Sequence, residues 1–323
     1  MQQQTMDPAL DPEVAAVAPP RPTSRVGTVV TALVLFGPFA GAILGAIFVA
    51  RRETTVTSLA IAVVLYLLSG HGLSAGFHRM CTHRAFRATR ATKIALVLLG
   101  SLTFEGGVLG WASNHRQHHA FTDLPGDPHS PHLAGSSIGA QLRGAVHAHA
   151  GWLFVPPPQD AERWIPDLLA DHDLVVLDRL FPLWCGVSLA VPTLLGFAFT
   201  GTGSGALGGF IWGGLVRVFV LQQATFAVNS ACHLFGRSPF RTRKGDQARN
   251  LPLLGIVAMG EGWHNLHHAM PRSVRCGVGH GGWDSTARLV WLLERAGMVK
   301  DVHWPDAQTL AARRRERPLP PNS

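Results

Sequence analysis

Four apolar stretches, each about as long as a bilayer crossing, constrain this chain more than any other feature. A transmembrane helix needs about 20 predominantly apolar residues. Stretches that meet this requirement occupy residues 26–50, 56–73, 184–200 and 207–228. The first two are separated by a short turn that contains Arg51 and Arg52, and the last two by an uncharged, glycine-rich segment. We therefore expect an all-α membrane protein whose four transmembrane helices form two hairpins.

The composition favours lipid over nucleic acid as a partner. Charged residues make up only 15% of the 323 residues, whereas a soluble domain carries about 25%. The net charge of +8 comes mostly from arginines between and after the apolar stretches, which is typical of a cytoplasmic face. We expect a bilayer partner, no nucleic acid, and one integral-membrane domain over residues 26–312. In a bacterium it would lie in the inner or plasma membrane.

The ends of the chain and its cysteines indicate a cytoplasmic setting. Residues 1–25 are rich in proline, alanine and glutamine and lack the order of a signal peptide, so we expect a disordered cytoplasmic tail. Residues 313–323 are basic and then proline-rich, and we expect a second disordered tail there. The four cysteines show no CxxC pairing, which suits a reducing compartment. Four crossings with both termini in the cytoplasm satisfy the positive-inside rule.

Histidines are concentrated in three clusters beside the apolar stretches. Two clusters have the pattern HxxHH, and on a helix the positions i, i+3 and i+4 project from one face. His233 follows Asn229 by four residues, so these two side chains also share a face. Three imidazoles that converge without a metal would be costly, which favours metal binding. The clusters are His78 and His83; His115, His118 and His119; and His264, His267 and His268.

The first cluster has a spacing that does not suit an ideal helix. With 3.6 residues per turn, His78 and His83 are about 140° apart. They could not hold one ion without distortion, so we expect them to reach two ions or to lie on a frayed helix end. Eight or nine histidines exceed the ligands that one ion can use, which indicates two ions. Imidazole suits Zn, Fe, Cu and Ni alike, so spacing does not identify the metal.

A fifth apolar stretch, residues 94–111, is long enough to cross but contains Glu105 and four glycines. A carboxylate at the bilayer centre costs about 2.5–3.5 kcal/mol on insertion scales. If this stretch crossed, the first histidine cluster would lie on the opposite side of the membrane from the second. We therefore predict that it does not span and that all the clusters meet on the cytoplasmic side.

At these residues the chain resembles the membrane fatty-acyl desaturases, specifically bacterial-type members of the delta-9 acyl-CoA (stearoyl-CoA-like) branch. The resemblance covers about residues 72–302 and rests on HxxxxH, HxxHH and HxxHH in this order, with NSxxH between the last two. It implies a four-helix transmembrane bundle with a cytosolic helical cap that carries a di-iron site above an acyl tunnel. Phe226 and Asn114 depart from the family pattern, which bears on chain length and double-bond position rather than on the metal site.

The resemblance also implies the chemistry and the partners. Two iron ions would use O2 to desaturate a saturated acyl chain, carried on CoA, at the delta-9 position. Electrons would come from a separate ferredoxin-like or cytochrome b5-like carrier with its reductase, since no fused cytochrome b5 domain is visible. Asn229 would approach one iron through water. The implied iron ligands are His78, His83, His115, His118, His119, His233, His264, His267 and His268.

Two alternative functions stay open at this point. Related membrane hydroxylases, acetylenases and monooxygenases use similar histidine-rich sites and would be distinguished by their products. A metal-binding or metal-transporting membrane protein is a more distant alternative. Transport ligands are expected near the bilayer midplane, whereas these histidines lie just outside the apolar stretches.

Four further residues are candidates for supporting roles. Asp127 and Asp284 could accept hydrogen bonds from ligating imidazoles, or they could instead cap loops or pair with arginines. Arg79 and Arg116 could contact an anionic head group such as a CoA phosphate, or they could form structural ion pairs.

Overall fold

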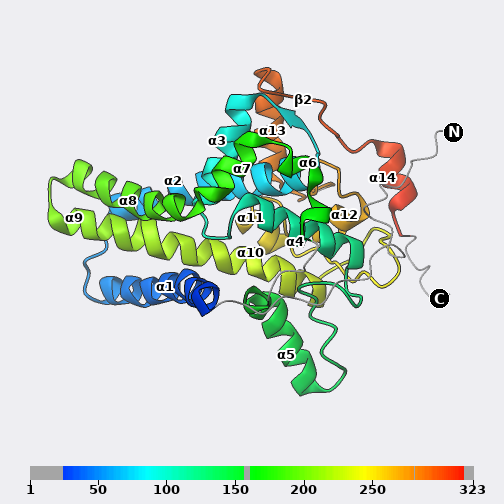
Figure 1. Cartoon of the computed structure of the whole chain (residues 1–323), viewed down its shortest axis with the longest axis horizontal. Helices are drawn as coiled ribbons and strands as arrows, with labels where there is room; N and C mark the ends of the chain where they lie inside the picture. Colours follow the sequence, from blue (N-terminus) through cyan, green and yellow to red (C-terminus); the bar gives the residue numbers. More distant parts are fainter. Residues whose placement is uncertain (1–24, 156–160, 280, 316–323) are drawn as a thin grey trace, which may run out of the picture.

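The computed structural model describes residues 25–155, 161–279 and 281–315, and most of them are helical (Figure 1). The expected N-terminal tail, apart from residue 25, lies outside the described residues. The expected C-terminal tail begins with ordered backbone, because the carbonyl of Arg313 accepts the N–H of Arg241 at 2.8 Å and the N–H of Arg315 donates to Pro239 at 2.8 Å. Residues 316–323 lie outside the described part.

Short helices and one small sheet complete the chain. The two strands pair in antiparallel register, with Arg87 opposite Lys300. The elements are α1 (Arg25–Ala50), α2 (Val56–His71), η3 (Gly72–Thr82), β1 (Arg87–Ala88), α3 (Arg90–Ser101), α4 (Val108–Phe121), α5 (Ile138–His149), η4 (Gly151–Phe154), η5 (Ala161–Trp164), α6 (Pro166–Leu169), α7 (His172–Arg179), α8 (Phe181–Thr200), α9 (Gly203–Gly208), η6 (Gly209–Val216), α10 (Arg217–Leu234), α11 (Pro252–Val257), α12 (His264–Ala269), α13 (Ser285–Arg295), β2 (Val299–Lys300) and α14 (Ala307–Arg313).

Four continuous helical segments in the described part are long and apolar enough to cross a membrane, which confirms the expected number. They are Gly27–Ala50, Val56–Thr82, Phe181–Thr200 and Gly203–Leu234. The second is longer than expected because α2 continues without a break into η3, a π-helix. The fourth likewise joins α9, the π-helix η6 and α10. Large apolar side chains such as Leu33, Val63 and Phe199 are exposed on these segments, as a lipid-facing surface requires.

The spans approach one another closely where glycines remove side-chain bulk. A Cβ added at Gly41 of α1 would lie 2.1 Å from the Cβ of Leu215 in η6. A Cβ at Gly209 would lie 2.1 Å from the carbonyl oxygen of Pro192 in α8. In lipid, where no hydrophobic force drives apolar helices together, such close contact is what stabilises helix packing.

The fifth apolar stretch is divided into two helices and is not among the candidate spans of the described residues. The chain turns between α3 and α4 with positive φ values at Phe104 (63°) and Gly106 (93°). Arg217, which is only 3% exposed in the fourth span, donates to the carbonyl of Leu102 at 2.6 Å and to Ser188 Oγ at 2.7 Å. Its guanidinium therefore faces the bundle interior and anchors the break, which offsets part of the cost of burial.

The largest buried core lies where η3, α3, α4 and α7 meet. Phe77, Val97 and Val108 are fully inaccessible to solvent there, and Leu174 is 2% exposed. This core fixes η3 against α4, and these two elements carry the first two histidine clusters.

Candidate metal centre

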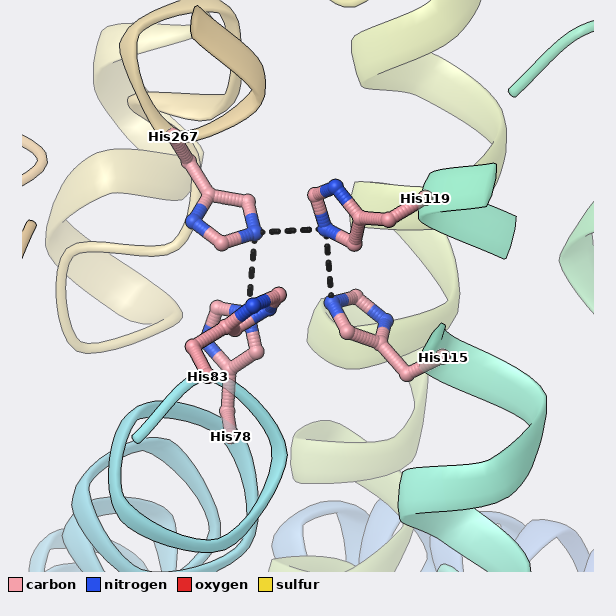
Figure 2. A group of neighbouring side chains, drawn as sticks. All are labelled: His78, His83, His115, His119 and His267. Carbon is pink, nitrogen blue, oxygen red and sulfur yellow. Dashed lines mark hydrogen bonds between the residues drawn. The ribbon is translucent and has the colours of Figure 1, made fainter. Parts of the chain in front are cut away.

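All nine histidines singled out by their spacing lie together in two buried groups. The five-histidine group contains His78, His83, His115, His119 and His267. The four-histidine group contains His118, His233, His264 and His268. Within each group, one ring nitrogen per residue lies within 4.8 Å of all the others. Figure 2 shows the five-histidine group, whose rings turn toward a common centre.

Each HxxHH cluster is divided between the two groups. In α4, His115 and His119 join the five-histidine group while His118 joins the other. In α12 the division is reversed, since His267 alone joins the five-histidine group. On a helix, position i+3 lies about 60° to one side of position i and position i+4 about 40° to the other. Each helix therefore lies between two sites and serves both.

The expectation for His78 and His83 was wrong about the helix. Both residues belong to one group, because η3 is a π-helix and not an α-helix. The N–H of His83 donates to the carbonyl of His78 at 3.1 Å, and the Thr82 hydroxyl donates to Phe77 at 2.8 Å. In such i to i+5 bonding, residues five apart lie one above the other. The spacing that seemed to separate these two rings therefore brings them together.

The ring nitrogens converge in a way that suits metal ions. In the five-histidine group, Nε2 of His267 lies 3.0 Å from that of His78 and 2.8 Å from that of His119. In the other group, Nε2 of His264 lies 3.1 Å from that of His233 and 3.0 Å from that of His268. These contacts bring together Nε2 lone pairs that accept no hydrogen bond from any other group among the described residues. Nε2 of His83 and of His118 are buried and have no hydrogen-bond partner among the described residues.

In four of these rings, the Nδ1 atom on the side away from Nε2 contacts a carboxylate. Such contacts fix the tautomer, so that Nε2 presents its lone pair to a metal. Asp127 is one of them, as one alternative from the sequence expected. The other three carboxylates lie 22 to 183 positions from their histidines in the sequence, so no local motif indicated them. The Nδ1–oxygen distances are 2.9 Å for His118–Asp127, 2.8 Å for His233–Asp123, 3.0 Å for His268–Asp246 and 2.8 Å for His78–Glu261.

Burial makes most of these imidazoles neutral, which is the form that binds metal. It lowers the pKa of six rings well below 6.5, namely His83, His115, His119, His264, His267 and His268. Burial would also lower the pKa of His118, but the Asp127 carboxylate raises it overall. Burial would raise the pKa of Glu261, but His78 and Arg79 lower it to about 2.

A pocket that is partly open to solvent adjoins both groups. Its wall includes His78 and His115 from the five-histidine group and His264 from the other. Asn229, expected near a metal, also lines it, as does Glu105. Apolar side chains form much of the remaining wall, including Leu73, Leu221, Val228, Ala258 and Met259.

The aromatic rings around the cavity hold two histidines in place. Trp111 stacks on His115 with ring centres 4.9 Å apart. His129, which sequence reasoning did not single out, stacks on His118 at 4.3 Å and also lines the cavity. Its only sequence signal is its position two residues after Asp127.

The remaining supporting candidates make structural contacts. Asp284 binds Arg79 at 3.0 Å and caps α13 by accepting the N–H of Ala287 at 2.9 Å. Arg79 is 1% exposed and contacts Glu261 as well. Arg116 is buried and pairs with Asp167 at 2.6 Å. These contacts match the second alternative for each residue, the cap or ion pair, and they engage both guanidinium groups inside the protein.

The apolar helices and the paired histidine groups define the class of the protein: a helical membrane protein built around a buried, histidine-rich site suited to metal. The family profile described as fatty acid desaturase matches residues 54–280. The chain belongs to the fatty acid desaturase family, and it is an acyl desaturase oxidoreductase.

Several relatives agree with this assignment. A hex-5-enoyl-acyl-carrier-protein acetylenase of Moorena producens (strain JHB) is 37% identical over 79% of this chain and 80% of its own length. An sn-1 stearoyl-lipid 9-desaturase of Anabaena variabilis is 31% identical over 83% of this chain and 92% of its own. A probable acyl-CoA desaturase of Schizosaccharomyces pombe is 31% identical over 77% of this chain and 50% of its own.

Proposed function

We propose that this protein uses two iron ions and O2 to introduce a double bond at the delta-9 position of a saturated fatty-acyl chain carried on CoA. The observation that carries the proposal is the pair of buried histidine groups beside a mostly apolar pocket. Five and four imidazoles suit two separate ions, and the cavity has the mostly apolar wall that an acyl chain requires. The nine histidines are the proposed ligands, and Asn229 approaches one ion through water.

The bound iron would supply an oxidant strong enough to remove hydrogen from an unactivated CH2 group. The protein's own residues position the reactants. The carboxylates on Nδ1 fix the imidazoles, and Trp111 holds the His115 ring at the cavity wall. The buried apolar wall excludes water from the acyl chain. One turnover combines O2, two electrons, two protons and two hydrogen atoms of the chain to give two waters and one double bond.

The proposal extends to the setting of the reaction. The two electrons come from a separate ferredoxin-like or cytochrome b5-like carrier with its reductase. The four spans form two hairpins, and the histidine site, its helical cap and both termini lie on the cytoplasmic side. The arginine-rich segments between and after the spans support this orientation.

A second candidate is an acetylenase acting on a chain bound to acyl-carrier protein. It is favoured by one observation, the 37% identity to the relative that bears this name. The two candidates share the site and differ in substrate, because the acetylenase oxidises an existing double bond to a triple bond.

Product analysis tests both candidates. The purified, iron-loaded protein would be incubated with O2, a reduced ferredoxin system and each of stearoyl-CoA, stearoyl-acyl-carrier protein and hex-5-enoyl-acyl-carrier protein. The proposal predicts an oleoyl product from stearoyl-CoA, identified by mass spectrometry, and none from the His264→Ala variant. A hydroxylated main product would contradict desaturation. A terminal alkyne from the hexenoyl substrate, without oleoyl product, would favour the second candidate.

A further inference from the structure

The 241–247 loop contacts both histidine groups, although none of its residues lines the cavity. Asp246 accepts a hydrogen bond from Nδ1 of His268 at 3.0 Å. The N–H of Gln247 donates at 3.0 Å to the Asp123 oxygen that lies 2.8 Å from Nδ1 of His233. Asp246 therefore bonds directly to the ring of His268, and Gln247 reaches the ring of His233 through the Asp123 carboxylate.

The same loop also reaches the five-histidine group. Arg243 donates to the backbone carbonyl of His119 at 3.4 Å. The loop is held down by close packing, since a Cβ added at Gly245 would lie 2.9 Å from Leu124. The 241–247 loop is therefore held in place and contacts residues of both histidine groups.

Exposed arginine and lysine side chains lie on the 241–247 loop and beside it. The backbone of Arg241 bonds to that of Arg313 at 2.8 Å, and Phe240 and Arg314 form a β-bridge. These bonds place the loop beside the end of α14. The basic patch consists of Arg241, Arg243, Lys244, Arg313, Arg314 and Arg315, all exposed. Among the described residues, none of the six forms an ion pair.

The position of the patch argues against one common role of a basic patch. In Figure 1, α14 lies at the opposite end of the molecule from α9, which begins the fourth span. A patch that held the phosphates of an acyl carrier would adjoin the cavity, but no patch residue lines it.

We infer that the basic patch is the docking surface for an acidic one-electron carrier protein and that the 241–247 loop is where electrons enter. This inference rests on the proposed function, which requires two electrons for each turnover. In each docking event the carrier is oxidised by one electron and the histidine-bound centre is reduced by one. Two events therefore supply the pair. Opposite charges accelerate the encounter and make its rate fall steeply with salt.

The test uses a two-iron, two-sulfur plant-type ferredoxin, which is acidic, and the full-length iron-loaded protein in detergent. The variant R241E/K244E/R314E reverses three patch charges without altering Arg243 or any ring contact. We expect it to weaken ferredoxin binding and to slow the reoxidation of reduced ferredoxin by at least about tenfold at low salt. The wild-type rate should fall as NaCl is raised from 50 to 500 mM, and the variant's rate should change little.

Three controls separate docking from damage. The variant R143E/R179E/K300E reverses three exposed charges on α5, α7 and β2, and it should stay within twofold of wild type. Iron content and reduction by photoexcited deazaflavin, a small uncharged donor, should be equal in all three proteins. If the patch variant R241E/K244E/R314E lost iron, Lys244→Glu alone would still be expected to slow ferredoxin reoxidation measurably.

Other outcomes would overturn the inference. Equal ferredoxin binding and reoxidation in wild type and patch variant would do so. Patch-dependent binding of anionic vesicles or of free CoA, without any effect on ferredoxin, would also do so. Failure of the proposed function looks different, since the wild type would then take electrons from ferredoxin in a patch-dependent manner yet form no alkene.

Discussion

At the scale of single residues, a carboxylate lies behind the imidazole ring of four of the nine histidines. Asp127 accepts from Nδ1 of His118 with both oxygens, at 2.9 and 3.0 Å, and its side chain is fully buried. Its carboxylate also accepts the N–H groups of Asp123 and His129. Asp127 therefore joins the ring of a proposed ligand to the turn that follows α4.

Replacing Asp127 with Ala should lower iron affinity by about 10–100-fold, because the His118 ring loses the contact that fixes its orientation. Iron retained after dialysis against a competing chelator measures the effect. Asp301→Asn, at an exposed carboxylate, is the matched control and should retain iron like the wild type. Full retention by the Asp127 variant would show that the carboxylate does not support the metal.

Glu105 is a second residue with a measurable consequence. Its Oε1 is buried without a hydrogen-bond partner among the described residues, and burial raises the pKa of the carboxyl well above 4.5. Above pH 4.5 the Glu105 carboxyl ionises in the unfolded chain but keeps its proton in the folded protein. Folding stability therefore falls as pH rises between the unfolded and the folded pKa, by up to about 1.4 kcal/mol per pH unit.

Glu105→Gln should remove this loss, since the amide does not ionise. We expect the variant to unfold at a higher temperature than the wild type at pH 8, with the difference shrinking toward pH 5. Thermal unfolding in detergent at the two pH values measures it, with Glu53→Gln at an exposed position as the control. A difference independent of pH would contradict a neutral Glu105.

At the scale of elements, η3 decides the position of the first histidine cluster. The π-helix lies tightly against α3, and a Cβ at Gly72 would lie 2.3 Å from the backbone nitrogen of Gly100. The backbones of η3 and α3 cannot move apart freely, because both elements belong to the buried core.

Gly72→Ala should therefore displace η3, lower the unfolding temperature and reduce iron retention through His78 and His83. Gly110→Ala on α4 is the matched control, because an added Cβ there has nothing within 4 Å. Alanine is favoured over glycine in a helix by roughly 0.5–1 kcal/mol, so the control should be neutral or slightly stabilised. Equal iron retention in the two variants would show that the π-helix tolerates the shift.

The same elements show how far sequence reasoning extends. Spacing alone identified all nine histidines and the four apolar segments, since both depend on local periodicity. It failed at His78 and His83 because it assumed an α-helix, and nothing in the local pattern signals i to i+5 bonding. It missed Asp123, Asp246 and Glu261 because their contacts depend on how distant loops fold over the site. It also left the partners of Arg217 undefined, and they come from α8 and from the break before α4.

At the scale of the whole molecule, the metal site joins parts of the chain that are far apart in sequence. The five-histidine group links η3 to α4 and α12, and the four-histidine group adds α10. A ligand that binds only the folded state stabilises it by about 2.7 kcal/mol when its concentration is 100 times its Kd.

Removing the metal should therefore lower the unfolding temperature of the entire protein rather than loosen one helix. Calorimetry in detergent, before and after chelation, measures the change. The double variant His118→Ala/His264→Ala, which lacks two proposed ligands of the four-histidine group but keeps the five-histidine group, should show a smaller change in unfolding temperature on chelation than the wild type. Equal unfolding temperatures for loaded and stripped wild type would show that the two groups are held together without metal.

The π-helix at residues 72–82 and the short helix at residues 264–269 also set an order of events during synthesis. The ribosome completes the first two spans long before it reaches His264, and chains grow at about 5–20 residues per second. His78 and His83 therefore remain without the histidines of α12 until the last two spans have been synthesised. Loading with metal is consequently a late step in biogenesis, and a chain that stalls before α12 leaves an incomplete, exposed set of ligands for quality-control proteases to recognise.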